Sequence, residues 1–181
     1  MNSREAALRF LIEIGAASSA HSQDVLLLHL LGTEAILQTW GGSPALCHAG
    51  LFHAIYGTHS FRRPPLMPTD QNRDKVRRYI GEDSESIVFA YSNVTLKDLR
   101  NNNSLTHVPN LSFESTDTRP SSIEVMSSLL NLIVANEVEQ LARASFPLSE
   151  SLLNLDEEMM IRLLPDARSY LNGLKANVYG I

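Results

Sequence analysis

Histidine is the residue type whose distribution along this chain most suggests chemistry. Five of the six histidines fall within residues 21–59: His21, His29, His48, His53 and His59. Histidine is the commonest metal ligand in proteins and the usual acid–base residue near neutral pH. Residues 21–59 are therefore where a metal ion or a catalytic proton would be held.

His29 and His53 are predicted to lie on neighbouring helices and to approach each other. His29 sits among leucines in a run that is apolar nearly all round, which predicts a buried position on a helix. Ala49 and Gly50 precede His53 by about one turn, and small residues there let a helix approach another closely. Because a tight turn at 41–43 joins the two helices, an antiparallel pair would bring both imidazoles to one point, which is half of a metal site. The alternative is that each is a core histidine bonded to a carbonyl or hydroxyl group.

Three further residues are candidates for the same site. His21 is the best third ligand because it lies in the loop before the His29 helix. The alternative, that His21 hydrogen-bonds the backbone at the start of that helix, fits equally well. Three histidines would hold one zinc or iron ion with an open position. Tyr56 shares the helical face of His53 and would orient a substrate or act as an acid, or else be a buried aromatic whose hydroxyl meets solvent or backbone. Thr33, one turn after His29, would hydrogen-bond that imidazole or its ligand, or else its own backbone.

The elements that must position these residues are all predicted to be helical. Apolar residues recur at spacings of three and four, no segment gives a convincing strand, and residues 101–121, rich in Asn, Ser, Thr and Pro, are predicted to be a loop. We predict helices between Ser3 and Gly15, at 23–40, 44–56, 73–80, 82–91, 95–100 and 122–144, and two more within 147–173. The predicted fold class is all-α, a single domain over residues 1–181 with about seven to nine helices.

The composition excludes several classes of protein. The 181 residues are 44% hydrophobic and 19% charged, which suits a globular core and excludes wholesale disorder. A net charge of −5, from 15 basic and 20 acidic residues, argues against nucleic acid as a partner, since such binding needs a basic surface. The single cysteine, Cys47, excludes an internal disulfide and a multi-cysteine metal site. No apolar stretch reaches the ~18 residues of a membrane helix and the amphipathic N-terminus is unlike a signal peptide, so no membrane partner and a cytoplasmic location are expected.

Several short motifs together resemble the HD-domain superfamily. They are HLLGT from His29, then Trp40, AGLFHAIYGT at 49–58, and ANEVE at 135–139. HD-domain proteins have an early histidine, a helix ending in A-x-L-x-H-D, and a late A-D-x-x-E segment. The chain is more closely similar to a small HD-like group that carries AGLFHSIYGT and has no assigned activity. The resemblance implies an HD-like helical domain with its core at about 20–145 and a C-terminal helical extension at 147–181.

Two departures from the HD pattern restrict what the resemblance implies. In HD phosphohydrolases and the related di-iron oxygenases, the Asp that follows the histidine and a late Asp both bind metal. Ala54 and Asn136 stand at those positions here, so phosphodiesterase and di-iron chemistry are not carried over. A mononuclear site of His21, His29 and His53 remains, for Zn, Fe or Mn. Asn136 would contribute an amide oxygen to it, or else act as a polar pin between buried helices.

The resulting hypothesis is a small HD-like enzyme or ligand-binding protein that acts on a small organic molecule through a pocket centred on His29 and His53. Its chemistry would be acid–base or mononuclear-metal chemistry. The candidate catalytic residues are His53, His29 and Tyr56, and the candidate substrate-binding residues are Thr33, Trp40, Thr58 and Asn136. The alternative is a catalytically inactive HD-like domain that binds a metabolite or a protein. A homodimer is compatible with an apolar all-α surface, but no residue pattern specifies its interface.

Overall fold

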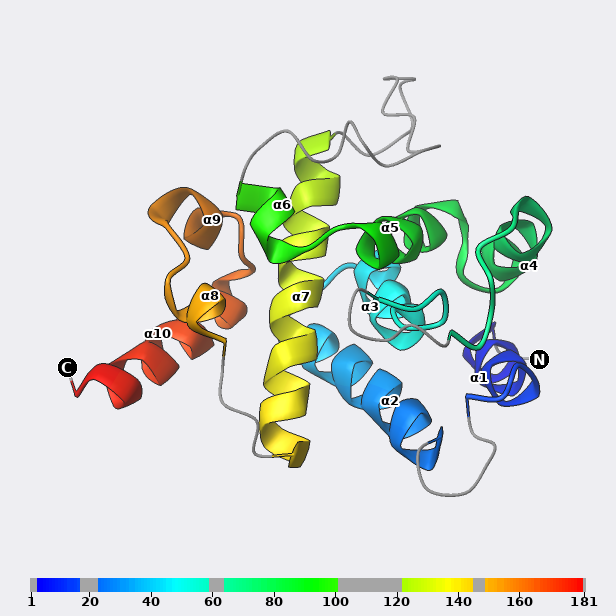
Figure 1. Ribbon diagram of the computed structural model, residues 1–181, viewed down its shortest axis with the longest axis horizontal. Helices are drawn as coiled ribbons and strands as arrows, with labels where there is room; N and C mark the ends of the chain where they lie inside the picture. The colour runs from blue at the N-terminus through cyan, green and yellow to red at the C-terminus, as the bar shows by residue number, and fades with distance from the viewer. Residues whose placement is uncertain (1–2, 17–22, 59–63, 101–121, 145–148, 181) are drawn as a thin grey trace.

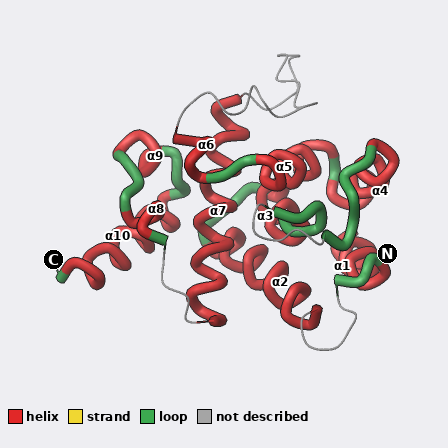
Figure 2. Tube along the Cα trace, in the orientation of Figure 1, coloured by secondary structure: helices red, strands yellow, loops and turns green. Residues whose placement is uncertain are grey.

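The computed structural model describes residues 3–16, 23–58, 64–100, 122–144 and 149–180. Within these ranges every regular element is a helix and there is no strand (Figure 2), so the predicted all-α class is confirmed. The ten helices are α1 Ser3–Glu13, α2 Gln23–Thr39, α3 Pro44–Phe52, α4 Asp70–Ile80, α5 Glu82–Asn93, α6 Leu96–Arg100, α7 Ser122–Ala144, α8 Glu150–Leu153, α9 Glu157–Ile161 and α10 Pro165–Tyr179. None of these helices has the length and apolar character needed to cross a membrane.

Helix α7 runs through the middle of the molecule (Figure 1). It contacts α2, α3 and α5 on one side and α6 and α10 on the other. Of the six residues from Leu129 to Val134, five are at most 3% exposed, and the sixth, Ile133, is 8% exposed. A long helix that is apolar on most sides must be covered on most sides. Helices α1 and α10 lie at opposite ends of the long axis of the molecule (Figure 1).

Helices α2 and α3 form the antiparallel pair that the sequence predicts. The chain reverses at Gly41, whose φ of 75° is left-handed, and Ser43 then caps α3 by accepting a hydrogen bond from the Leu46 amide. At Gly50 the two helices come so close that a Cβ atom would lie 2.6 Å from Leu37 Cδ1. The small residue before His53 thus sets the distance between the helices.

The end of α3 differs from the prediction. The helix stops at Phe52 rather than at Tyr56, and residues 53–56 form a tighter turn in which Ile55 N donates to Phe52 O. Gly57, with φ 82°, closes this turn by donating its N–H to Ala54 O. The backbone at His53 and Tyr56 therefore winds more tightly than an α-helix, and the expected face-sharing of these two side chains does not follow.

The C-terminal part contains three helices where two were predicted. Asn131 of α7 fastens it by accepting a hydrogen bond from Leu164 N, at the start of α10, and by donating to Arg162 O. The Trp40 ring, at the end of α2, packs on the Tyr170 ring of α10 with 6.0 Å between centroids. The C-terminal extension is thus joined to the rest of the structure through α7 and α2.

Candidate functional site

His29 and His53 meet at the crossing of α2 and the end of α3. Their Nε2 atoms lie 3.0 Å apart, and the two rings are nearly perpendicular, with 4.9 Å between centroids. The structure therefore brings together the two residues on which the sequence hypothesis rests.

His53 is held in one tautomer by the backbone. Its Nδ1 lies 2.8 Å from Gly50 O, and because a carbonyl can only accept, Nδ1 must carry the proton. The electron pair of Nε2 then points at His29. The ring is 1% exposed and packs edge-on against Tyr91, with 5.2 Å between centroids. Burial, followed by the neighbouring His29, lowers the pKa of His53 to about 3, so the ring stays neutral at physiological pH.

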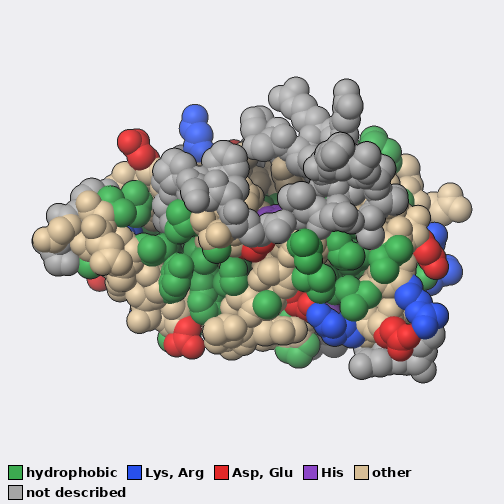
Figure 3. Space-filling view, turned by 90° about the horizontal axis from the view of Figure 1, so that it is seen from below, with side chains coloured by type: hydrophobic (Ala, Val, Ile, Leu, Met, Phe, Trp, Pro, Cys, Tyr) green, Lys and Arg blue, Asp and Glu red, His purple; other side chains and the backbone are tan. Residues whose placement is uncertain are grey.

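His29 is held from the opposite side by a carboxylate. Its Nδ1 contacts Glu139 Oε2, which comes from α7 and belongs to a residue only 4% exposed. A carboxylate accepts hydrogen bonds, so Nδ1 of His29 also carries a proton, and its Nε2 also faces inward. The His29 side chain is 14% exposed. Histidine and acidic side chains both reach the face of the molecule drawn in Figure 3. The pair is buried on the His53 side and reaches the surface at His29.

Asn136 adds an oxygen to the same place. Its Oδ1 lies 3.1 Å from His53 Nε2 and 3.1 Å from the amide nitrogen of Gln140. Asn136 and Glu139 are three residues apart on α7, which puts both on the face that meets the histidines. Of the two predicted roles, metal ligand or polar pin, this geometry is compatible with both.

His53 Nε2 has an acceptor atom on two sides when both rings are neutral. These two atoms are Nε2 of His29 and Oδ1 of Asn136, and electron pairs about 3 Å apart repel unless a cation lies between them. Two ligands bonded to one ion at 2.0–2.1 Å, with an angle between a right angle and the tetrahedral value, lie about 2.8–3.4 Å apart. The measured 3.0 and 3.1 Å fall in that range. These distances match two ligands of one metal ion, and the 3.0 Å between the two nitrogens also matches a hydrogen bond that shares one proton.

The ligand set is short of the three histidines predicted. Among the described residues no group of three or more His, Cys, Asp and Glu side chains is placed to hold a metal ion. The predicted third ligand, His21, lies outside the described residues. The donors that the structure places together are therefore two imidazoles and one amide oxygen.

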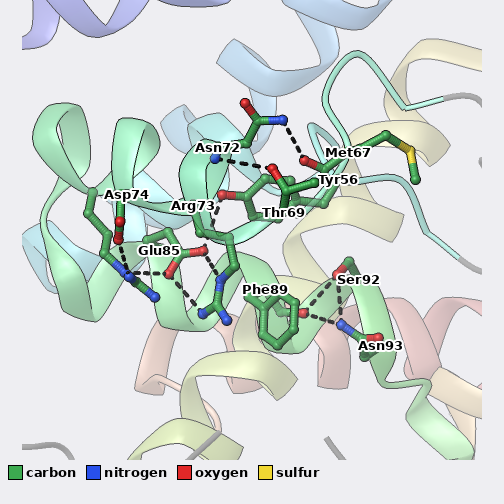
Figure 4. A network of polar contacts seen from close by, with 11 residues as sticks. Tyr56, Met67, Thr69, Asn72, Arg73, Asp74, Glu85, Phe89, Ser92 and Asn93 are labelled. Carbon is green, nitrogen blue, oxygen red and sulfur yellow. Dashed lines mark hydrogen bonds and ion pairs between the residues drawn. The ribbon is translucent and has the colours of Figure 1, made fainter. Parts of the chain in front are cut away.

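Tyr56, predicted to orient a substrate beside His53, is engaged elsewhere. Its hydroxyl donates to Glu85 Oε1 at 3.1 Å, and Glu85 also accepts two bonds from Arg73 and one from Arg77 (Figure 4). Arg73 in turn lies 3.6 Å above the Phe89 ring. Burial, together with the Glu85 charge, raises the pKa of the Tyr56 phenol far above its ordinary value. A phenol so held neither releases a proton near neutral pH nor turns toward a substrate, so it fastens the turn after His53 to α4 and α5.

The other predicted substrate-binding residues are placed as follows. Thr33 is fully buried and its hydroxyl donates to His29 O, which is the backbone-bonding alternative. Trp40 lies eleven residues beyond His29, just past the C-terminal end of α2 and about 16 Å away along the helix axis, and packs on Tyr170. Thr58 follows the Gly57 turn and is half-buried. Asn136, whose side chain contacts the ring of His53, enters the function proposed below.

Sequence reasoning missed Glu139, which contacts His29, and Tyr91, which packs on His53. Glu139 lies within the ANEVE segment, three residues after Asn136, so the helical spacing alone marked it as facing the same way. No local signal marked Tyr91, because only the packing of α5 on α3 brings it to the ring.

Comparison with known proteins gives a family-model match over part of the chain. Residues 10–95 match a family model described as a domain of unknown function (DUF6817). The matched stretch is just under half of the chain and includes both His29 and His53, whereas Asn136 and Glu139 lie beyond it. No curated protein and no solved structure matches the chain.

Proposed function

We propose that this protein is a small HD-like helical enzyme, or a ligand-binding protein, that holds one divalent metal ion between His29 and His53 and acts on a small organic molecule there. One observation carries the proposal. Both Nδ1–H groups donate to acceptors behind the rings, so the Nε2 electron pairs of His29 and His53 face each other, and His53 Nε2 also lies beside Asn136 Oδ1. Metal-binding histidines are typically backed in this way by a carboxylate or a carbonyl.

The donor set indicates which ion fits. Two imidazoles and one amide bring no negative charge, whereas Mg²⁺ and Ca²⁺ select several carboxylate oxygens. Imidazole ligands suit Zn²⁺ and Fe²⁺ better, and the amide oxygen of Asn136 is the type of ligand that suits Mn²⁺. A bound ion with an open position would polarise a substrate carbonyl or lower the pKa of a water molecule. In this arrangement His53 serves as a fixed neutral ligand and His29 lies on the side that reaches the surface.

Metal-free acid–base chemistry is the second form of the same proposal. A single proton between the two Nε2 atoms satisfies both electron pairs, with His29 as the donor and His53 as the acceptor. His29 is then the group that exchanges protons with a substrate, because it is the more exposed of the two and is held by Glu139.

A catalytically inactive binding module is the competing function, and one observation favours it. Ala54 and Asn136 stand where HD enzymes carry metal-binding Asp residues, so the site lacks the carboxylates that such chemistry uses. In this case the pair is a polar feature of a domain that binds a metabolite or a protein.

Metal analysis separates these functions. We expect the purified protein, after addition of Zn²⁺, Fe²⁺ or Mn²⁺ and removal of the excess, to retain about one ion per chain. His29→Ala and His53→Gln should lose it, while His48→Ala, on α3 five residues before His53, should keep it. Circular dichroism checks that each variant folds. A wild-type protein that retains no ion, and whose thermal stability is unchanged by a chelator, would exclude the metal form of the proposal.

The location and partners of the protein belong to the same proposal. A cytoplasmic location is inferred from the sequence alone, as are a small-molecule ligand, the lack of nucleic-acid and membrane partners, and the compatibility with a homodimer.

A further inference from the structure

Glu139 is a buried carboxylate that reaches from α7 to α2. It is 4% exposed, and its Oε2 contacts Nδ1 of His29. Burial of a carboxylate is costly unless the group is hydrogen-bonded in a specific arrangement. The helical spacing of Glu139 on α7 explains which way its side chain points. It does not explain why a carboxylate is buried there.

Helix α2 has a glycine where the Glu139 side chain passes close to its backbone. Gly32 lies three residues after His29, and a Cβ atom there would stand 2.7 Å from Glu139 Cγ and 2.9 Å from Glu139 Oε1. Contacts under 3.0 Å are not tolerated without a shift of one group. Glu139 Cγ lies only two bonds from the α7 backbone, so it yields less readily than the tip of a long side chain. Helix α2 thus lacks a side chain at the position where the carboxylate passes.

We propose that Glu139 is the positioning residue of the histidine site, and that Gly32 is the gap that admits it. A carboxylate only accepts hydrogen bonds, so it fixes the proton of His29 on Nδ1 and turns the Nε2 electron pair toward His53. It also places a negative charge one ring away from a donor set that carries none. The proposal rests on the proposed function for its metal readout, but its claim about the His29 ring does not depend on a metal ion.

Metal affinity provides the first test. Zn²⁺ and Mn²⁺ are titrated into four variants: Glu139→Gln, Gly32→Ala, Glu158→Gln and Gly173→Ala. Loss of a group behind a ligating histidine typically weakens binding by about 10–100-fold, and we expect this for Glu139→Gln and Gly32→Ala. Glu158→Gln removes an exposed glutamate paired with Arg162, and Gly173→Ala adds a Cβ with nothing within 4 Å. These matched controls should bind like the wild type.

The tautomer of His29 provides the second test, on metal-free protein at one pH. Nitrogen NMR of labelled imidazoles should show the His29 proton on Nδ1 in the wild type. In Glu139→Gln the amide can donate as well as accept, and in Gly32→Ala the carboxylate is displaced, so both should change the His29 signals. The His53 proton, held by Gly50 O, should stay on Nδ1 in every variant.

The two tests distinguish failure of the metal site from failure of the role proposed for Glu139. A wild type that takes up no metal but shows the expected His29 tautomer, lost in Glu139→Gln, overturns the metal site and leaves the role of Glu139 standing. A folded Glu139→Gln variant with wild-type metal affinity or a wild-type His29 tautomer overturns the role of Glu139 and leaves the metal site standing. A wild-type His29 with its proton on Nε2 also overturns it.

Discussion

His29 and His53 are alike in type but differ in what stands behind them. His53 has a backbone carbonyl behind it and is almost inaccessible, whereas His29 has a carboxylate and retains some contact with solvent. The meeting of the two rings could be predicted, because a tight turn joins two helices that each carry one histidine. Glu139 could not be predicted in the same way, because its contact spans 110 residues and a charged residue is by default expected on the surface.

The buried His53 makes the stability of the metal-free protein depend on pH. Its pKa is about 3 in the folded chain and ~6.5 in an unfolded one, so below pH 6.5 the unfolded state binds the extra proton. The contribution of His53 to stability is therefore fully present well above pH 6.5. It falls as the pH drops toward 3, by up to about 1.4 kcal/mol per pH unit. We expect this group to lower the stability of chelator-treated protein by about 1.5 kcal/mol between pH 6.5 and 5 in urea unfolding.

His53→Gln is the control for this pH dependence, since glutamine does not titrate. The loss between pH 6.5 and 5 should be smaller in the variant by the contribution of one histidine. Identical pH profiles for the wild type and the variant would contradict the prediction.

Glu85 is the residue whose removal should cost the most stability. It is fully buried and accepts hydrogen bonds from Tyr56, Arg73 and Arg77 (Figure 4). Glu85→Gln leaves the Arg73 guanidinium buried without its charge partner, and breaking one side of a buried pair costs about 3–5 kcal/mol. Urea unfolding measures this loss. Asp74→Asn, which removes the exposed partner of Arg77, should cost at most about 1 kcal/mol. Equal losses in both variants would show that the buried Glu85 network stabilises the fold no more than an exposed ion pair does.

At the scale of helices, local signals predict where elements start better than where they stop. The start of α3 follows from Ser43 and Pro44, and the break between α4 and α5 from Gly81, which has a φ of 83°. The prediction placed the start of α4 at residue 73, but Thr69 caps the helix by accepting from the Asn72 amide, so it begins at Asp70. The end of α3 was missed because no breaking residue lies between Phe52 and Gly57.

The closeness of α2 and α3 should make Gly50 intolerant of a side chain. An added Cβ would stand 2.6 Å from Leu37 Cδ1 and 3.4 Å from the Glu34 backbone, and Leu37 is fully buried, so its side chain would have to shift within the core. Overpacking of this kind costs about 1–3 kcal/mol. We expect Gly50→Ala to lower the free energy of unfolding by that amount.

Gly173→Ala on α10 gives the matched comparison. A Cβ there meets nothing within 4 Å, so the variant should gain about 0.5–1 kcal/mol from helix propensity alone. The two Gly→Ala changes should therefore have opposite signs in the same denaturant series. A stabilising Gly50→Ala would show that the helices have room to separate.

At the scale of the whole molecule, the candidate site requires both parts of the chain. The histidines come from α2 and the turn after α3, inside the stretch that matches the family, and Asn136 and Glu139 come from α7, beyond it. The sequence predicted an all-α domain, since helical periodicity is strong along most of the chain. It predicted too few helices, because α8 and α9 are only four and five residues long and such short helices carry little periodic signal.

If the structure is one cooperative unit, its only tryptophan should report the same unfolding transition as all its helices. Trp40 is 7% exposed and touches Tyr170 of α10, so its fluorescence monitors the contact between α2 and the C-terminal extension. Far-UV circular dichroism monitors every helix. We expect the two urea transitions to coincide, as they do for two-state domains.

Tyr170→Ala should shift the Trp40 emission toward that of an exposed indole while lowering stability by only about 1 kcal/mol, because Tyr170 is itself 43% exposed. A fluorescence transition that precedes the loss of helix in the wild type would mean that α8–α10 detach before the core around α7 unfolds. The extension would then be a separate unit, and the histidine site should survive its detachment, which metal binding at that intermediate urea concentration would reveal.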